Sequence, residues 1–237
     1  SEARHNGTKY VSIAPDFSMV SKYSDWWIPV KPGTDAALWM AVNHVILKEF
    51  FEERQVPYFI NYLKQYTDST FLVELEKDGD AYKAGRLLRA NRVKRYTNEE
   101  NGDWKLLVFD KTSKQPRMPK GTVGYRWSKE KGKWNLKMED GQDDTPLDPE
   151  LTFLDEHDEI GNDAYHEFAE AKVALRGIPI RYVETDRGRV PVTTAFDLLV
   201  AQFGVSRGLP GDYPKSYDEI GPYTPAWQEQ YTGIGRD

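Results

Sequence analysis

A long apolar helix is the sequence feature that most limits how this chain can fold. Thr34 is an expected N-cap, and Asp35 lies in the first turn, where a carboxylate suits the helix dipole. Residues 36–51 contain no glycine or proline, and only two of the first twelve, Asn43 and His44, are polar. A helix that is apolar nearly all round needs neighbours on every side. We therefore expect it to be buried in a larger α/β body.

Two short extended segments precede this helix. Residues 9–14 predict a short buried strand that stops at Pro15, and residues 26–30 predict a second extended segment. Residues 18–23 between them have room for one or two helical turns. In an open α/β sheet, ligands bind beyond the carboxyl ends of the strands. The loops that follow the two segments, 14–18 and 31–35, are therefore the candidate binding loops.

These two loops carry residues that suit a nucleotide. An acidic residue such as Asp16 can accept hydrogen bonds from a ribose hydroxyl. The carboxylate of Asp35 can accept from both N1–H and the exocyclic amine of guanine, and Gly33 would let the backbone approach that base. The alternative is purely structural, with Asp16 in a turn and Asp35 stabilising the helix start. Spacing alone leaves both interpretations open.

The remainder of the chain predicts further helices and strands with a change of character in the middle. Helices are expected from Pro57 onward, over 194–203 and after Thr224-Pro225; strands are expected over 70–75, 173–175 and 180–185, with a hairpin turn at 186–189 and an ambiguous stretch at 81–93. Short alternating runs between 104 and 138 indicate a β-rich insertion. We expect residues 1–95 to form a partial α/β lobe, 96–172 a β-rich and acidic insertion, and 173–237 the return to the lobe.

Charge is concentrated in one window of the chain. Thirteen carboxylates and no lysine or arginine lie between residues 139 and 170. The formal net charge of the whole chain is −6, so the residues outside this window together carry a charge of +7. We expect a solvated acidic loop. A docking surface for a basic partner or a divalent-cation site remains an alternative.

Composition excludes several kinds of chemistry. With no cysteine there is no disulfide, no thiolate metal site and no thiol nucleophile, and the four histidines are too scattered for a metal site. An acidic balance argues against nucleic acid, and no run of about 18 apolar residues predicts a membrane span. No nucleophile-elbow, Walker or dinucleotide-fingerprint motif occurs. We therefore predict no catalytic residue and no metal ligand in this chain.

The candidate loops resemble a known family. The stretches Tyr10–Ser18 and Asp25–Leu38 resemble the segment of the dimethyl-sulfoxide-reductase family of molybdopterin oxidoreductases that binds one of two guanine dinucleotides. The shared pattern is a strand, a turn with aspartate, a short helix, and then Pro-Gly-Thr-Asp-x-Ala-Leu opening a long helix. The resemblance implies a partial Rossmann-like lobe with the β-rich insertion, α+β in overall character. It also implies that Asp16 and Ser18 contact the ribose-phosphate part and that Gly33, Thr34 and Asp35 contact the guanine, with Pro32 as a further cofactor-binding residue of the same loop.

More of the chain is similar to the catalytic subunits of membrane-associated respiratory nitrate reductases and their nitrite-oxidising relatives. The similar stretches are Leu72-Val73, Gly85–Ala90, Gly124–Trp127, Gly132–Leu136, Val192–Leu198 and Tyr223–Trp227. The similarity implies a molybdenum-dependent exchange of an oxygen atom between nitrate and nitrite. It also implies an iron–sulfur cluster elsewhere in the subunit, an iron–sulfur partner subunit and a membrane anchor subunit, with no membrane insertion by this chain itself.

The resemblance further implies an internal fragment that is inactive alone. Neither the direction of the reaction nor the side of the membrane follows from this segment. Fragments of chlorate, perchlorate or selenate reductases are one alternative, because they share the cofactor fold. A non-catalytic domain whose acidic window docks a basic partner is the alternative from a different class.

Overall fold

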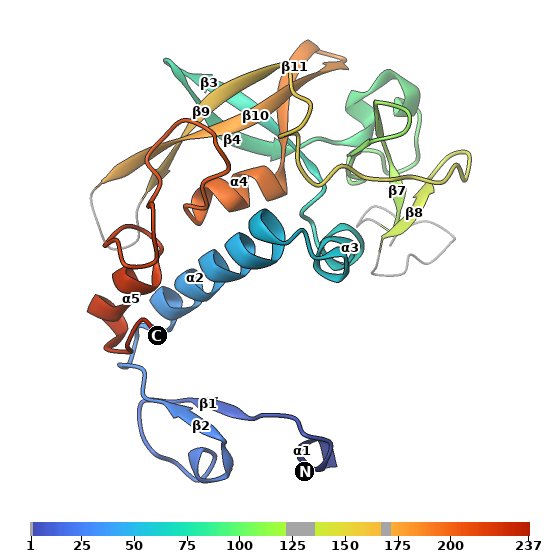
Figure 1. The fold of residues 1–237 in the computed structure, drawn as a ribbon. Coiled ribbons are helices and arrows are strands. Elements are labelled where there is room, and N and C mark those ends of the chain that lie inside the picture. The colour runs from blue at the N-terminus through green and yellow to red at the C-terminus, as the bar shows by residue number, and fades with distance from the viewer. Residues whose placement is uncertain (1, 122–135, 167–171) are drawn as a thin grey trace. The chain divides into compact units, whose positions relative to one another are not determined.

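A computed structural model describes residues 2–121, 136–166 and 172–237, which pack as two compact units. The first unit comprises Ser1–Glu49, Phe203–Ser206 and Tyr213–Asp237, and the second comprises Phe50–Gln202 and Arg207–Asp212. Helices and strands are mixed along the chain (Figure 1), which confirms α+β character. Of the short alternating runs expected between 104 and 138, the part at 122–135 lies outside the described residues. The boundaries proposed at 95 and 172 stay a prediction.

The first unit contains the expected strand, turn and helix order. Its elements are α1 (Glu2–His5), β1 (Val11–Ile13), the 3₁₀ turn η1 (Ser21–Tyr23), β2 (Trp26–Ile28), α2 (Asp35–Ile46) and α5 (Pro225–Thr232). After α2 the chain continues as a π-helical stretch, η2 (Leu47–Glu53). Strands β1 and β2 pair in parallel, with Ile13 opposite Ile28. The short strands and the long helix were therefore predicted correctly.

Burial of the first unit is lower than the sequence predicted. Of α2, only Ala37, Leu38, Ala41 and His44 are buried, while Trp39 is 52% exposed. In β1 only Ser12 is buried. The expectations of a fully enclosed helix and a buried strand are therefore wrong within this chain. The physical reason is that β1 and β2 form a sheet of only two strands, and a pair of strands covers little surface.

Helix α5 packs against α2. Its start follows the sequence signal closely, because the Thr224 hydroxyl accepts a hydrogen bond from the Trp227 amide at 3.1 Å and Pro225 occupies the first turn. Gly233 ends the helix with φ +73°, a left-handed conformation that glycine adopts without strain. Trp227 is 1% exposed.

The second unit is built on a closed five-stranded barrel that the sequence did not predict. The barrel order is β10 (Val173–Thr185), β11 (Gly188–Thr194), β3 (Leu72–Asp78), β4 (Ala81–Leu87) and β9 (Glu159–His166). These strands lie together above α4 (Ala195–Gln202) in Figure 1. The expected strands at 173–175 and 180–185 are one continuous strand, and the ambiguous stretch 81–93 is β4 followed by the 3₁₀ turns η3 (Ala90–Arg92) and η4 (Lys94–Tyr96).

One glycine allows the barrel to close. Strands β4 and β9 pair only where Tyr82 meets Asp163, in parallel. A Cβ on Gly161 would lie 2.6 Å from Tyr82 Cδ2 and 2.5 Å from Ile180 Cδ1, closer than real carbon contacts allow. Tyr82 and Ile180 belong to the barrel core together with Leu75, Tyr165, Ile178 and Ala201. Glycine at this position therefore lets the two strands approach over a packed aromatic ring.

A second core of this unit lies under short strands and turns. The remaining elements are α3 (Pro57–Tyr66), β5 (Val108–Asp110), β6 (Gln115–Arg117), β7 (Pro119–Lys120) and β8 (Lys137–Asp140). Leu72, Tyr96, Leu107, Met118 and Phe153 are fully buried among them. Within the segment predicted to be β-rich, the described residues form the short strands β5, β6, β7 and β8.

The acidic window is solvated only in part: Asp143, Asp144, Asp148, Asp155, Glu156 and Asp158 are exposed, as expected for a solvated loop, but other carboxylates are not. Three of its carboxylates are at most 9% exposed: Asp140, Glu150 and Asp163. Asp140 accepts a 2.5 Å hydrogen bond from the Tyr96 hydroxyl and lies 3.4 Å from the Arg117 guanidinium. Glu150 pairs with Arg181 at 3.1 Å. The basic remainder of the chain thus supplies the counter-charges that allow the window to fold into the second unit.

In the described part of the chain, no helix is long and apolar enough to cross a membrane.

Candidate functional site

The parallel pairing of β1 and β2 places both candidate loops at one edge of the two-stranded sheet. Register-matched Ile13 and Ile28 are the last residues of their strands, and the loops 14–18 and 29–35 begin immediately after them. The Ala14 amide donates to the Ile28 carbonyl at 3.1 Å, so the ends of the strands are joined by a backbone hydrogen bond. This is the arrangement that the spacing of the sequence suggested.

The first loop is held by its backbone and by Trp27. The Ser18 amide donates to the Asp16 carbonyl at 3.0 Å, and the Trp27 indole donates to the Ala14 carbonyl at 2.9 Å. Phe17 meets the Trp27 ring edge-on, with ring centroids 5.2 Å apart. These contacts leave the Asp16 side chain exposed and the Ser18 side chain half-buried. The turn is thus ordered by groups other than the two predicted ligand residues.

The second loop is a tight turn at the start of α2. The Thr34 hydroxyl and amide both donate to the Lys31 carbonyl, at 2.7 Å and 3.2 Å. Thr34 is the N-cap residue, as predicted, but its side chain makes no capping hydrogen bond because the hydroxyl turns back to Lys31. Gly33 adopts φ +79°, and no atom lies within 4 Å of where a Cβ would be. The backbone at Gly33 is therefore open to a flat ligand.

Sequence reasoning missed what braces the second loop. The Lys31 amide donates to the Thr232 carbonyl at 3.1 Å, at the end of α5. A Cβ on Gly233 would lie 2.9 Å from the Lys31 Cε, so the lack of a side chain at this position leaves room for the Lys31 side chain. Only the pairing of distant segments reveals this contact. Gly233 both ends α5 and leaves room for Lys31, and neither role was predicted from the sequence.

The carboxylates of the two loops are available to a ligand. Asp16 and Asp35 are exposed, and neither carboxylate has a hydrogen-bond or ion-pair partner within residues 2–121, 136–166 and 172–237. An unpaired carboxylate beside an open glycine backbone fits a purine that presents two adjacent N–H donors. Pro32, also exposed, precedes Gly33 in the same turn. The residues present therefore fit a guanine nucleotide.

Metal coordination finds no support among the described residues. No group of three or more histidine, aspartate or glutamate side chains there could hold a metal ion. The acidic window was the sequence's one candidate for such a site.

Comparison with known proteins identifies close relatives along the whole chain. No protein-family model matches it. The chain is 43% identical to the nitrate reductase alpha chain of Bacillus subtilis over 238 aligned residues, which cover 100% of this chain and 19% of the relative. It is 39% identical to the respiratory nitrate reductase 1 alpha chain of Escherichia coli, over 99% of this chain and 20% of the relative.

A more distant relative covers less of the chain. The perchlorate reductase subunit alpha of Dechloromonas aromatica is 37% identical over 52% of this chain and 12% of its own length. The chain therefore spans about a fifth of the length of the nitrate reductase alpha chains that it matches.

Proposed function

Since this chain belongs to the nitrate reductase alpha-chain family, we propose that it forms part of the guanine-dinucleotide-binding lobe of a molybdenum-dependent oxidoreductase. The substrate pair of the whole enzyme would be nitrate and nitrite. Identity over the full chain supports nitrate ahead of perchlorate, whose reductase matches only half of it. The role of this chain is to position the cofactor, and it contributes no catalytic residue.

The observation that carries the proposal is the parallel register of β1 and β2. It puts Asp16 and Ser18 on one loop and Pro32, Gly33, Thr34 and Asp35 on the next, at one edge of the sheet. A parallel pair followed by a long helix is compatible with a Rossmann-like lobe. The two loops supply a carboxylate and a hydroxyl for the ribose-phosphate part, and an open glycine beside a second carboxylate for the guanine.

Each residue has a definite task in this proposal. Asp35 accepts two hydrogen bonds from guanine, from N1–H and the exocyclic amine, and so selects guanine over adenine. Gly33 lets the ring lie against the backbone. When bound, the molybdopterin guanine dinucleotide supplies the metal for a two-electron oxygen-atom transfer, and the protein's contribution here is binding and orientation.

The partners follow from the same family. We propose an iron–sulfur electron-transfer subunit and a membrane anchor subunit, so that the complex associates with a membrane through its partners. An iron–sulfur cluster of the catalytic subunit would be held by residues outside this chain.

Asp35→Asn tests the proposal, because it keeps the size of the side chain but replaces one acceptor oxygen with a donor. In the full-length subunit we expect guanine-nucleotide affinity to fall about 10- to 100-fold, the loss of hydrogen bonds to a charged acceptor. The measurement is guanine nucleotide released per mole of purified protein. Helix α2 loses at most about 1 kcal/mol of dipole stabilisation, so thermal unfolding separates misfolding from lost binding.

Asp218→Asn is the matched control, since this carboxylate belongs to the same unit and its side chain is 81% exposed. It should retain the wild-type nucleotide content. Full guanine occupancy in folded Asp35→Asn protein would refute the assignment of Asp35.

A further inference from the structure

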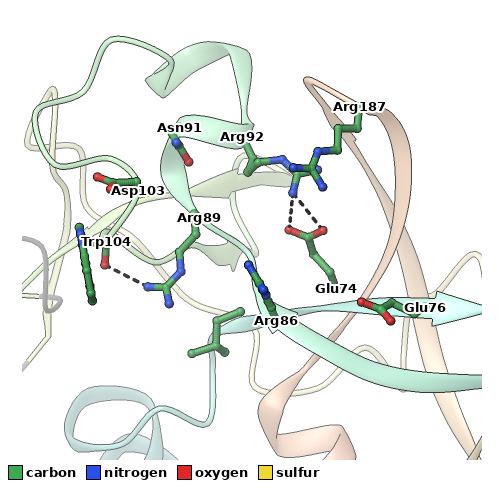
Figure 2. A pocket seen from close by; sticks show the side chains of 10 residues that line it. Glu74, Glu76, Arg86, Arg89, Asn91, Arg92, Asp103, Trp104 and Arg187 are labelled. Atoms are coloured by element: carbon green, nitrogen blue, oxygen red, sulfur yellow. Dashed lines mark hydrogen bonds and ion pairs between the residues drawn. The ribbon is translucent and has the colours of Figure 1, made fainter.

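A pocket of about 620 Å³ lies in the second unit, away from both candidate loops in sequence. It is formed by β3, β4, the segment 89–104 and the tip of the β10–β11 hairpin. Figure 2 shows Arg86 in the middle of the pocket, with Arg89 and Trp104 on one side and Arg92 and Arg187 on the other. Arg86 and Arg89 belong to the stretch Gly85–Ala90, which carries part of the family resemblance but has no assigned role.

One of the four arginines is already neutralised. Arg92 donates to both carboxylate oxygens of Glu74, at 3.0 Å and 3.2 Å, and it pairs with Asp186. Burial opposes its charge, but the hydrogen bond from Arg92 to Asp186 and the charge of Glu74 outweigh that effect and raise the pKa of Arg92. Arg92 therefore acts as a fixed structural cation that anchors the hairpin tip.

The other three arginines of the pocket are not neutralised by a carboxylate in the described part of the chain. Arg86 and Arg187 are exposed, and neither forms an ion pair with any carboxylate in the described ranges. Arg89 donates only to the Trp104 carbonyl, a neutral acceptor, at 3.3 Å. Guanidinium groups that line a pocket can each bind phosphate oxygens in a bidentate manner.

The hairpin turn holds the backbone of Arg187 in a defined place. The Thr185 hydroxyl donates to the Gly188 carbonyl at 2.8 Å and accepts from the Arg187 amide at 3.1 Å. Gly188 adopts φ +88°, which this short turn requires. The Asp186 amide also donates to the Arg92 carbonyl at 2.8 Å. Arg187 is thus presented by a rigid turn and not by a long loop.

An aromatic surface and further acceptors complete the pocket. Trp104 is 49% exposed and lines the side next to Arg89. An indole face stacks well on a nucleobase, and such stacking depends little on which base is present. Asp103 and Glu76 also line the pocket and give it acceptors for ribose hydroxyl or base amino groups.

We propose that this pocket binds a nucleoside diphosphate or triphosphate, with the phosphates on Arg86 and Arg187 and the base against Trp104. It shares no residue with the loops proposed for the guanine dinucleotide, so it would be a second and independent nucleotide site. The pocket combines two unpaired guanidinium groups, an aromatic face and hydrogen-bond acceptors. A bare oxyanion would use only the guanidinium groups, whereas a nucleotide would use all three features.

The test is calorimetric titration of the full-length holoenzyme, whose own cofactor sites are filled. The probes are ADP, inorganic pyrophosphate and adenosine. We expect ADP to bind more tightly than pyrophosphate, and Arg86→Gln or Arg187→Gln to weaken both anions about tenfold or more. Trp104→Leu should weaken ADP but leave pyrophosphate unchanged. Affinity for both anions should fall as salt is raised.

Lys83→Gln is the matched control, because Lys83 is an exposed cation of the same strand that does not line the pocket. It removes the same charge and should leave ADP affinity unchanged. Two results would overturn the proposal: ADP affinity unaltered in the Arg86→Gln/Arg187→Gln double variant, or no binding of either anion at millimolar concentration. Equal affinities for ADP and pyrophosphate, unaffected by Trp104→Leu, would contradict the nucleotide assignment. Failure of the Asp35→Asn experiment has no bearing on these outcomes.

Discussion

Replacing Asp197 by alanine should destabilise the protein by about 3–5 kcal/mol, because it leaves a buried cation without its partner. Asp197 is fully buried and lies 2.6 Å from the Arg207 guanidinium, whose side chain is 1% exposed. The carboxylate also accepts from the Phe153 amide at 2.9 Å and from the Thr152 hydroxyl at 2.5 Å. Alanine would therefore leave the Phe153 amide and the Thr152 hydroxyl without this acceptor, in addition to leaving the Arg207 charge without its carboxylate.

The measurement is the free energy of unfolding from chemical denaturation. Asp218→Ala, which removes an exposed carboxylate, should stay within about 0.5 kcal/mol of wild type. Replacing both partners, in Asp197→Leu/Arg207→Met, should recover much of the loss, since no unpaired charge then remains. A loss below about 1 kcal/mol for Asp197→Ala would contradict a buried, structural role for this pair.

Raising the pH from 10 to 12 should reveal a second large effect, at Tyr96. Burial, together with the hydrogen bond to the Asp140 carboxylate and its negative charge, raises the pKa of the Tyr96 hydroxyl to about 12. The ordinary tyrosine pKa in an unfolded chain is about 10. Between these values the unfolded state has released the proton and the folded state retains it, so the free energy of unfolding falls as pH rises. Two pKa units correspond to about 2–3 kcal/mol.

Tyr96→Phe removes this dependence. At neutral pH the variant should be less stable, because Asp140 loses the 2.5 Å hydrogen bond and the Met118 amide loses its acceptor at 3.2 Å. Between pH 10 and 12, however, its stability should decline less steeply than that of wild type. Tyr58→Phe, at a ring that is 80% exposed, should follow the wild-type curve. Parallel profiles of unfolding free energy against pH for wild type and Tyr96→Phe would show that the pKa of Tyr96 is not raised in the folded state.

Local signals in the sequence predicted the elements that depend on local chemistry. Thr224 and Pro225 start α5 because a hydroxyl and a ring-fixed φ act within one turn. The turn at 186–189 closes where glycine permits a positive φ. The two loops beside β1 and β2 were also predicted, because each follows its own strand directly.

Features that depend on distant pairing could not be predicted in the same way. The barrel requires β3 to pair with β11, and β4 to meet β9 at Tyr82 and Asp163. Neither pairing can be recognised from the pattern of residues within a single strand. The buried carboxylates of the acidic window were missed for the same reason, since Tyr96 and Arg117, which contact Asp140, lie outside the window in sequence. The pocket around Arg86 combines β3, β4, the segment 89–104 and the hairpin tip at Arg187, and it shows no motif.

Hydrogen exchange on the full-length subunit, prepared with and without its cofactor, tests the central claim most directly. Amides that contact or lie beneath a bound nucleotide exchange more slowly than in the free protein. We predict that cofactor binding slows exchange at residues 14–18 and 32–38, and that the hairpin tip at 185–188 in the second unit exchanges equally in both states. Unchanged exchange at both loops, with protection elsewhere in the subunit, would contradict the claim that these loops hold the guanine dinucleotide.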